Sequence, residues 1–122
     1  MLKLENVSKF YYNKGIIASG FTKVNLELKI GEFVVITGES GSGKSTLLNV
    51  ISGLDSYEEG EMYANGNETS HFSFFFFEDY RRKYVANIFQ TFNLVNSYTV
   101  YQNIELVLLL NGYKKRKVKK KI

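Results

Sequence analysis

The first part of the chain alternates hydrophobic and polar residues with the two-residue period of β-strands. Residues 2–7 predict a short strand, and residues 22–30 alternate cleanly, as in a half-buried antiparallel strand. The segment between them, residues 11–21, is expected to be a loop or a wide hairpin. Residues 60–65 predict one more strand that ends in a tight turn. The pattern therefore predicts an antiparallel sheet in this part of the chain.

Two other segments have the pattern of strands buried on both faces. Residues 33–37 open with a continuous apolar run, and residues 85–89 predict a second strand of this kind. Such strands are typical of α/β proteins, in which helices cover both faces of the sheet.

Helical spacing of hydrophobic residues follows each of these segments. The apolar residues within 47–51 recur at helical spacing, and residues 99–110 keep the same period. Thr99 is suited to cap the second of these helices, and Gly112 is suited to end it. Residues 78–83 predict a short charged helix.

Length and composition exclude several classes of protein. The chain has 122 residues, which is at most one domain or a piece of one. It contains no cysteine, so disulfides, thiolate metal sites and cysteine catalysis are excluded. The longest aliphatic run, residues 106–110, is far shorter than the roughly 18 residues that span a bilayer, so no transmembrane helix is expected.

The net charge of +4 comes from one short segment. Residues 114–121, where a last helix is expected to begin, contain seven of the 16 basic residues and no acidic residue. A basic tail can bind nucleic acid or an anionic membrane surface, or it can be a solvated helix face or a frayed end. We favour the solvated face or frayed end, and no specific nucleic-acid partner is expected.

The chemistry of the chain is carried by a glycine-rich loop between a predicted strand and a predicted helix. Residues 38–45 match the pattern G-x-x-x-x-G-K-[ST] of the phosphate-binding P-loop. Glycines let successive backbone amides point toward phosphate oxygens. The residues expected to contact nucleotide here are Gly38, Glu39, Ser40, Gly41, Ser42, Gly43, Lys44, Ser45 and Thr46.

Three of these side chains have separate expected roles. Lys44 places an ammonium against the β- and γ-phosphates, Ser45 offers a hydroxyl to Mg²⁺, and Thr46 hydrogen-bonds near the α-phosphate. The alternative is a flexible Gly/Ser turn with a solvated lysine, but the strand before it and the helix after it favour nucleoside triphosphate binding. This motif alone leaves kinases, GTPases, helicases and transport ATPases open.

The flanking residues resemble the nucleotide-binding domain of ABC transporters. Residues 31–55 are most similar to the subfamily of macrolide exporters, lipoprotein-release ATPases and antimicrobial-peptide export or resistance systems. Residues 59–66 fit the next strand of that family, residues 87–95 resemble its Q-loop with Gln90 as the glutamine, and residues 98–104 resemble the segment beyond.

The resemblance implies a fold class and a division of the chain. It implies an α/β fold, with a P-loop NTPase core and an antiparallel β-subdomain, truncated at the start of the helical subdomain. Residues 1–91 would form the β-subdomain and the core up to the Q-loop. Residues 92–122 would begin the helical subdomain and include the basic tail.

The resemblance also implies ligands and roles outside the P-loop. Tyr11, with Tyr12 as the fallback, would stack on the adenine of ATP, whereas an exposed loop tyrosine is the alternative. Gln90 would contact Mg²⁺ or the attacking water, whereas a polar residue at a strand end is the alternative. The expected cofactors are therefore ATP and Mg²⁺.

Three motifs of the complete family domain are absent from these 122 residues: the signature loop Leu-Ser-Gly-Gly-Gln, the catalytic glutamate and the switch histidine. The complete domain is an ATPase, but this chain alone is expected to bind ATP without efficient turnover. Residues 74–79 mimic the acidic motif but carry their acids in the wrong order and place, so Glu78 and Asp79 are not expected to hold Mg²⁺. His71 is expected to be a surface residue.

As an ABC transporter subunit, the chain would pair with a transmembrane permease and with a second ATP-binding domain, identical or not. It would lie in the cytoplasm on the inner face of the cell membrane, and the complex would export a peptide, lipoprotein or drug. The alternatives are a soluble ABC-type ATPase not linked to transport, a non-catalytic nucleotide-binding remnant, and a nucleic-acid-binding module that uses residues 114–121.

Overall fold

The structure is a computed structural model of the chain and describes residues 1–69 and 74–122. The chain divides into two compact units, Met1–Val85 and Ala86–Ile122. His71, which the sequence predicts to be a surface residue, lies outside the described residues. Within the described ranges, no helix is both long enough and apolar enough to cross a membrane.

The first unit is built on an antiparallel sheet with the strand order β2-β1-β3-β4. Its strands are β1 (Leu2–Asn13), β2 (Ile16–Leu28), β3 (Glu59–Ala64) and β4 (Asn67–Glu68). Residues 11–21, expected to be a loop or a wide hairpin, are instead mostly strand, because β1 and β2 continue to pair up to a turn at residues 14–15, with Tyr11 opposite Ala18. The antiparallel sheet predicted from the alternating pattern is therefore present.

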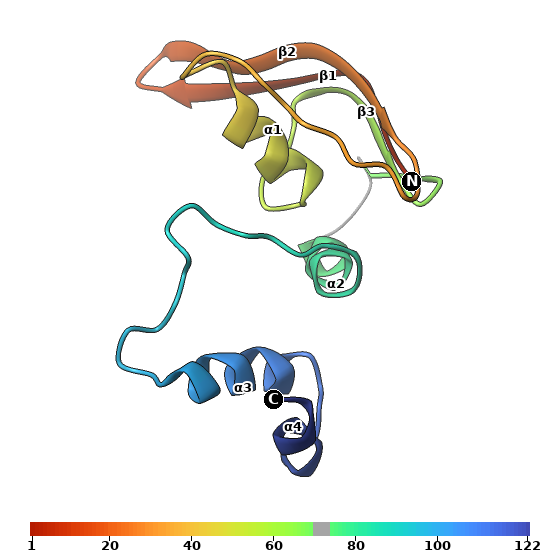
Figure 1. The fold of residues 1–122 in the computed structure, drawn as a ribbon. Helices are drawn as coiled ribbons and strands as arrows, with labels where there is room; N and C mark the ends of the chain where they lie inside the picture. Colours follow the sequence, from red (N-terminus) through yellow and green to blue (C-terminus); the bar gives the residue numbers. More distant parts are fainter. Residues whose placement is uncertain (70–73) are drawn as a thin grey trace. The chain divides into compact units, whose positions relative to one another are not determined.

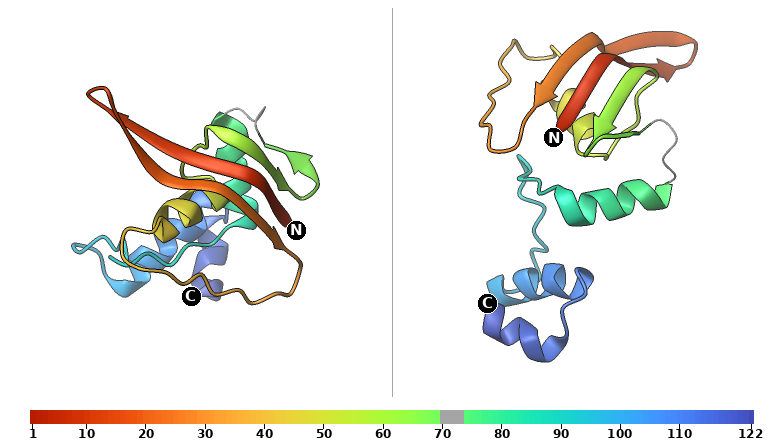
Figure 2. Two further views of the ribbon diagram at one scale, coloured as in Figure 1. Left: turned by 90° about the horizontal axis from the view of Figure 1, so that it is seen from above. Right: turned by 90° about the vertical axis from the view of Figure 1, so that its right-hand side faces the viewer.

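Helix α1 (Lys44–Ile51) packs on one face of this sheet (Figure 1, Figure 2). Leu47 and Val50 of α1 meet apolar side chains from β1, β2 and β3, and burying each such side chain stabilises the fold by roughly 1.5–3 kcal/mol. The buried hydrophobic residues of this core are Leu2, Leu4, Val7, Phe21, Leu47, Val50, Met62 and Ala64.

Helix α2 (Phe74–Tyr84) begins four residues before the predicted helix at 78–83. Phe77 and Tyr80 pack against the core, and their rings meet edge to face at 6.4 Å between centroids. The Tyr80 hydroxyl also donates to the Ile51 carbonyl at 3.1 Å, which holds α2 against the end of α1. These tertiary contacts stabilise a longer helix than the local charge pattern predicts.

The two buried strands predicted at residues 33–37 and 85–89 are wrong for this structure. Both segments are irregular, and most of their apolar side chains are open to solvent, with Phe33 93% and Ile88 98% exposed, whereas Ile36 packs partly buried against the core. A strand needs neighbours for its backbone hydrogen bonds. Within the described residues, neither segment has a strand to pair with.

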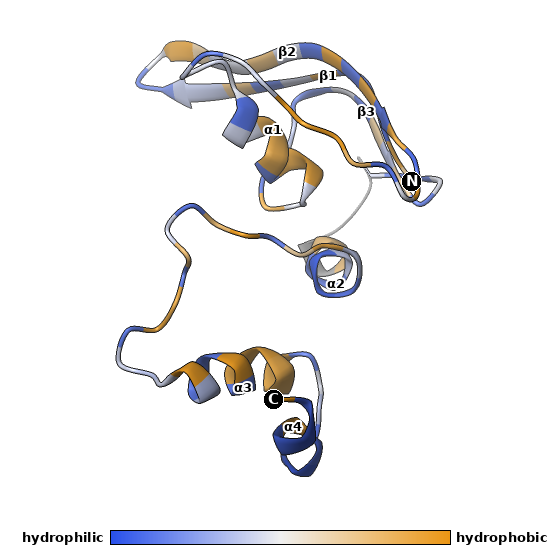
Figure 3. Cartoon of the chain, viewed as in Figure 1, coloured by the Kyte–Doolittle hydropathy of each residue, from blue (hydrophilic) through white to orange (hydrophobic). Residues whose placement is uncertain are grey.

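The second unit contains two helices, α3 (Val100–Leu110) and α4 (Lys115–Lys121). Figure 3 shows the contrast between them, because α3 is mostly hydrophobic and α4 is strongly hydrophilic. Val118 is the buried residue of α4, so the basic segment has one inward side and a solvated lysine-rich face. The last helix predicted near residue 114 is therefore confirmed.

The start of α3 agrees with its sequence pattern. Thr99 caps the helix, since its Oγ1 accepts from the Gln102 N–H at 3.2 Å, while Gln102 Oε1 accepts from the Thr99 N–H at 2.9 Å. This reciprocal capping box satisfies two amides that the first turn leaves without partners. Gly112, with φ of 83°, follows the C-terminus as expected.

We expect Thr99→Ala to destabilise α3 by about 1 kcal/mol, because the variant leaves the Gln102 N–H without its acceptor. Hydrogen exchange of the amides in the first two turns of α3 should then be about fivefold less protected. Ser97→Ala is the control, since Ser97 is exposed and lies before the cap. Equal protection in Thr99→Ala and the parent chain would contradict this assignment.

Candidate functional site

The glycine loop is the last part of the segment between β2 and α1, and its geometry depends on Gly43. This residue is the N-cap of α1 and has φ of 98°, in the left-handed region that favours glycine. A Cβ at Gly43 would lie 2.1 Å from the carbonyl oxygen of Gly20 in β2. The loop therefore touches the β1–β2 hairpin backbone to backbone, and a residue with a side chain does not fit there.

Lys44 is the first residue of α1, and its side chain folds back over the loop. Its Nζ donates to the carbonyls of Gly38 at 2.8 Å and Glu39 at 2.6 Å, and to Ser42 Oγ at 3.1 Å. These three acceptors fix the ammonium above the loop. The site thus has a preset positive charge beside the N-terminus of α1, whose first amides have no intrahelical acceptor.

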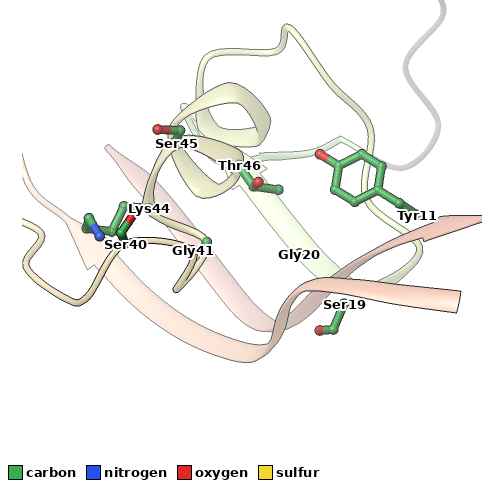
Figure 4. Close-up of a pocket in the computed structure, with 9 residues that line it drawn as sticks. Tyr11, Ser19, Gly20, Ser40, Gly41, Lys44, Ser45 and Thr46 are labelled. Carbon is green, nitrogen blue, oxygen red and sulfur yellow. The ribbon is translucent and has the colours of Figure 1, made fainter.

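A cavity of about 340 Å³ lies between this loop and the hairpin (Figure 4). The loop and the first turn of α1 form one wall, and the hairpin forms the other. Figure 4 shows the Tyr11 ring at the end of the cavity away from Lys44. The lining residues are Tyr11, Ser19, Gly20, Ser40, Gly41, Gly43, Lys44, Ser45 and Thr46.

Tyr11 is held at the cavity by charged neighbours. Its hydroxyl donates to Asp55 Oδ2 at 3.1 Å, and Lys9 Nζ lies 5.0 Å from the centroid of its ring. Lys9 is buried and forms ion pairs with Asp55 at 3.2 Å and Glu58 at 3.1 Å. Glu58 also accepts a hydrogen bond from the Phe10 N–H at 2.8 Å.

Lys9, Asp55 and Glu58 form a cluster beside Tyr11, and their opposite charges stabilise one another. Burial opposes the charged form of Lys9, but its hydrogen bonds to Glu58 and Asp55 outweigh burial and raise the Lys9 pKa. Burial likewise opposes the charged form of Asp55, but hydrogen bonds from Lys9, the Ser56 backbone and Tyr11 lower the Asp55 pKa. Both groups are therefore charged over the neutral pH range.

The structure brings together most of the residues that the sequence singles out. Tyr11 and six of the nine P-loop residues line the cavity. The other three, Gly38, Glu39 and Ser42, hold the Lys44 ammonium. Tyr12, the fallback for adenine, is 69% exposed and is not among the lining residues.

Gln90 lies in the second unit, in an exposed turn between α2 and α3. Its contact with Mg²⁺ or water therefore stays a prediction. The two acids of residues 74–79, which resemble the acidic motif of the family, lie on α2. There Glu78 pairs with Arg82 at 3.9 Å and Asp79 pairs with Lys83 at 2.9 Å. These exposed i,i+4 pairs are an ordinary helix surface.

Four residues at or beside the site are missing from the sequence prediction. Ser19 and Gly20 line the cavity, and a glycine within a strand pattern is a signal for close backbone approach. Lys9 and Asp55 hold Tyr11, but nothing in the local pattern marks them.

The donor set fits a phosphate-bound cation better than a metal held by protein alone. Among the described residues, no group of three or more His, Cys, Asp or Glu side chains could hold a metal ion. Ser45 lines the cavity and is exposed, so its hydroxyl is open to a cation that arrives with phosphate oxygens as its other ligands.

Comparison with known proteins agrees with this geometry. The family model for ABC transporters matches residues 21–122. The uncharacterized ABC transporter ATP-binding protein MJ1508 of Methanocaldococcus jannaschii is 38% identical over 124 residues, covering 98% of this chain and 55% of the relative. The macrolide export ATP-binding/permease protein MacB of Campylobacter fetus is 37% identical over 115 residues, covering 94% of this chain and 18% of MacB.

A solved structure shares the backbone as well. The ATP-binding cassette MJ0796 of Methanocaldococcus jannaschii, a dimer bound to ADP and Pi, matches with a TM-score of 0.88 and 39% identity over 98% of this chain and 53% of that chain. The expected α/β fold with an antiparallel β-subdomain is thereby confirmed. The chain spans about half the length of these two archaeal relatives. Because the family model covers more than half of the chain, this protein belongs to the ABC transporter family.

Proposed function

We propose that this chain binds MgATP as the P-loop part of an ABC transporter ATP-binding domain, which couples ATP binding and hydrolysis to transport. One observation carries the proposal. A cavity of about 340 Å³ has the P-loop and the Lys44 ammonium on one side and an aromatic ring, Tyr11, on the other. These are the two recognition elements that a nucleoside triphosphate requires, one for its phosphates and one for its base.

The phosphates would bind at the loop and the first turn of α1. Loop amides and the first amides of α1 would donate hydrogen bonds to the phosphate oxygens, with Thr46 near the α-phosphate. All three hydrogen bonds of the Lys44 ammonium go to the loop in this structure. A β- or γ-phosphate oxygen would therefore replace one of these acceptors, most easily the Ser42 hydroxyl, whose 3.1 Å contact is the longest of the three.

The remaining site residues would act on the cation and the water. Ser45, and Gln90 through its loop, would hold Mg²⁺, which supplies positive charge to the phosphates when it is bound. Gln90 would also position the attacking water. The Tyr11 ring would stack on adenine.

We expect Lys44→Ala to weaken MgATP binding by roughly 100-fold, because the variant removes charge-assisted hydrogen bonds worth about 3 kcal/mol. Isothermal titration calorimetry with MgATP measures the dissociation constant. Lys29→Ala makes the same change of charge at an exposed residue that does not line the cavity, and it should bind like the parent chain. Binding by Lys44→Ala that equals the parent would refute the assignment of this cavity.

We also expect the 122-residue chain alone to bind ATP without efficient turnover. The family resemblance implies that the signature loop, the catalytic glutamate and the switch histidine are not among its residues, and hydrolysis needs a group that positions the water. Phosphate release from MgATP by the purified chain should therefore stay at the background level of Lys44→Ala. Steady release by the parent chain that disappears in Lys44→Ala would contradict this proposal.

The partners and the location follow from the family. The chain would act beside a transmembrane permease and a second ATP-binding domain, on the cytoplasmic face of the cell membrane. Export of a peptide, lipoprotein or drug is the proposed class of transport, and the resemblance to MacB supports it.

Affinity capture from detergent-solubilised native membranes tests this assignment. We expect the chain to recover a polytopic membrane protein, because its proposed permease is an integral membrane subunit. A P-loop protein of another class, bearing the same tag, controls for adsorption of membrane proteins to the resin. Recovery of soluble proteins alone would favour an ABC-type ATPase that is not linked to transport.

A further inference from the structure

Lys9 is a charged residue in the interior of the first unit. It is 5% exposed, and its ammonium is paired with two carboxylates, Asp55 Oδ1 at 3.2 Å and Glu58 Oε1 at 3.1 Å. A buried ammonium is costly unless it is paired and hydrogen-bonded. These two acids therefore hold the Lys9 ammonium in place.

The same cluster holds the Tyr11 side chain at two points. The hydroxyl donates to Asp55 Oδ2 at 3.1 Å, and the Lys9 ammonium lies 5.0 Å from the ring centroid, within the range of a cation–π interaction. Tyr11 is 41% exposed and lines the cavity, so the ring is restrained while part of its surface stays open to a ligand.

Asp55 connects the ring to the phosphate end of the cavity. It lies four residues after the last residue of α1, and its backbone N–H donates to the Asn49 carbonyl of α1 at 3.2 Å. The first turn of the same helix carries Lys44, Ser45 and Thr46. One eight-residue helix thus bears the phosphate-binding turn at its start and the anchor of the Tyr11 hydroxyl just beyond its end.

We infer that Lys9 and Asp55 are positioning residues that fix the Tyr11 ring at a set distance from the P-loop, so that the site selects ligands carrying a nucleobase as well as a triphosphate. The inference rests on the proposed function, because it takes the cavity to be a nucleoside triphosphate site. A ring that is already held in place loses less side-chain freedom when a base stacks on it. Without the cluster, the ring would lose both its hydrogen bond to Asp55 and its contact with the Lys9 ammonium.

Two ligands separate this role from a structural one. MgATP engages both ends of the cavity, whereas magnesium tripolyphosphate engages the P-loop alone. We expect Lys9→Met to weaken MgATP binding about tenfold and to leave tripolyphosphate binding within about twofold of the parent chain. Tyr11→Phe keeps the ring but removes its hydrogen bond to Asp55, and it should weaken MgATP binding about fivefold with the same selectivity.

Isothermal titration calorimetry on the full chain measures all of these dissociation constants. Lys3→Met is the matched control, because Lys3 lies on the same strand but has a side chain that is 42% exposed and paired with Glu5. It should bind both ligands like the parent. Tyr11→Phe changes a single hydroxyl, so the inference stays testable if Lys9→Met does not fold.

The outcomes distinguish the inference from the proposed function. A loss confined to MgATP in Lys9→Met or Tyr11→Phe supports the positioning role. An equal loss for both ligands, or no loss, overturns it. A parent chain that binds tripolyphosphate as tightly as MgATP also overturns it, because the base is then not read. A parent chain that binds neither ligand refutes the proposed function itself.

Discussion

The site depends on one close approach between two stretches of backbone. A Cβ at Gly43 would lie 2.1 Å from the Gly20 carbonyl oxygen, and a Cβ at Gly20 would lie 2.8 Å from the methyl group of Thr46. Two residues without side chains therefore let the β1–β2 hairpin lie directly on the P-loop and the first turn of α1. The cavity between them, with Tyr11 at one end and Lys44 at the other, depends on this contact.

The antiparallel part of the fold could be predicted from the sequence because β1 and β2, which follow each other along the chain, pair with each other. Residues 22–30 alternate in polarity, and the strand that they predict pairs with its neighbour along the chain. Residues 33–37 and 85–89 are different, since an apolar run indicates that a segment is buried but does not name what covers it. Neither segment has a neighbouring strand among the described residues, and most of their apolar side chains stay exposed.

The phosphate side of the site could also be predicted, because its residues are contiguous and each type has a defined role. Its other wall could not, because Gly20 comes from a distant part of the sequence. The burial of Lys9 could not be predicted for a further reason. Register shifts in β1 around this residue break the two-residue period, so that Val7, Ser8 and Lys9 are buried in succession. A lysine in an alternating strand is normally assigned to the solvent face.

The free-energy cost of burying the Lys9 ammonium indicates what the cluster is for. Buried ion pairs add little net stability, because the loss of hydration offsets the attraction between the charges, and apolar residues of similar volume often serve a core as well. The sheet would therefore not need a lysine at this position to fold. What an apolar residue cannot do is hold Asp55, and through it the Tyr11 hydroxyl, in a fixed direction. The cluster is better explained by the geometry that it imposes on the mouth of the cavity than by the stability of the sheet.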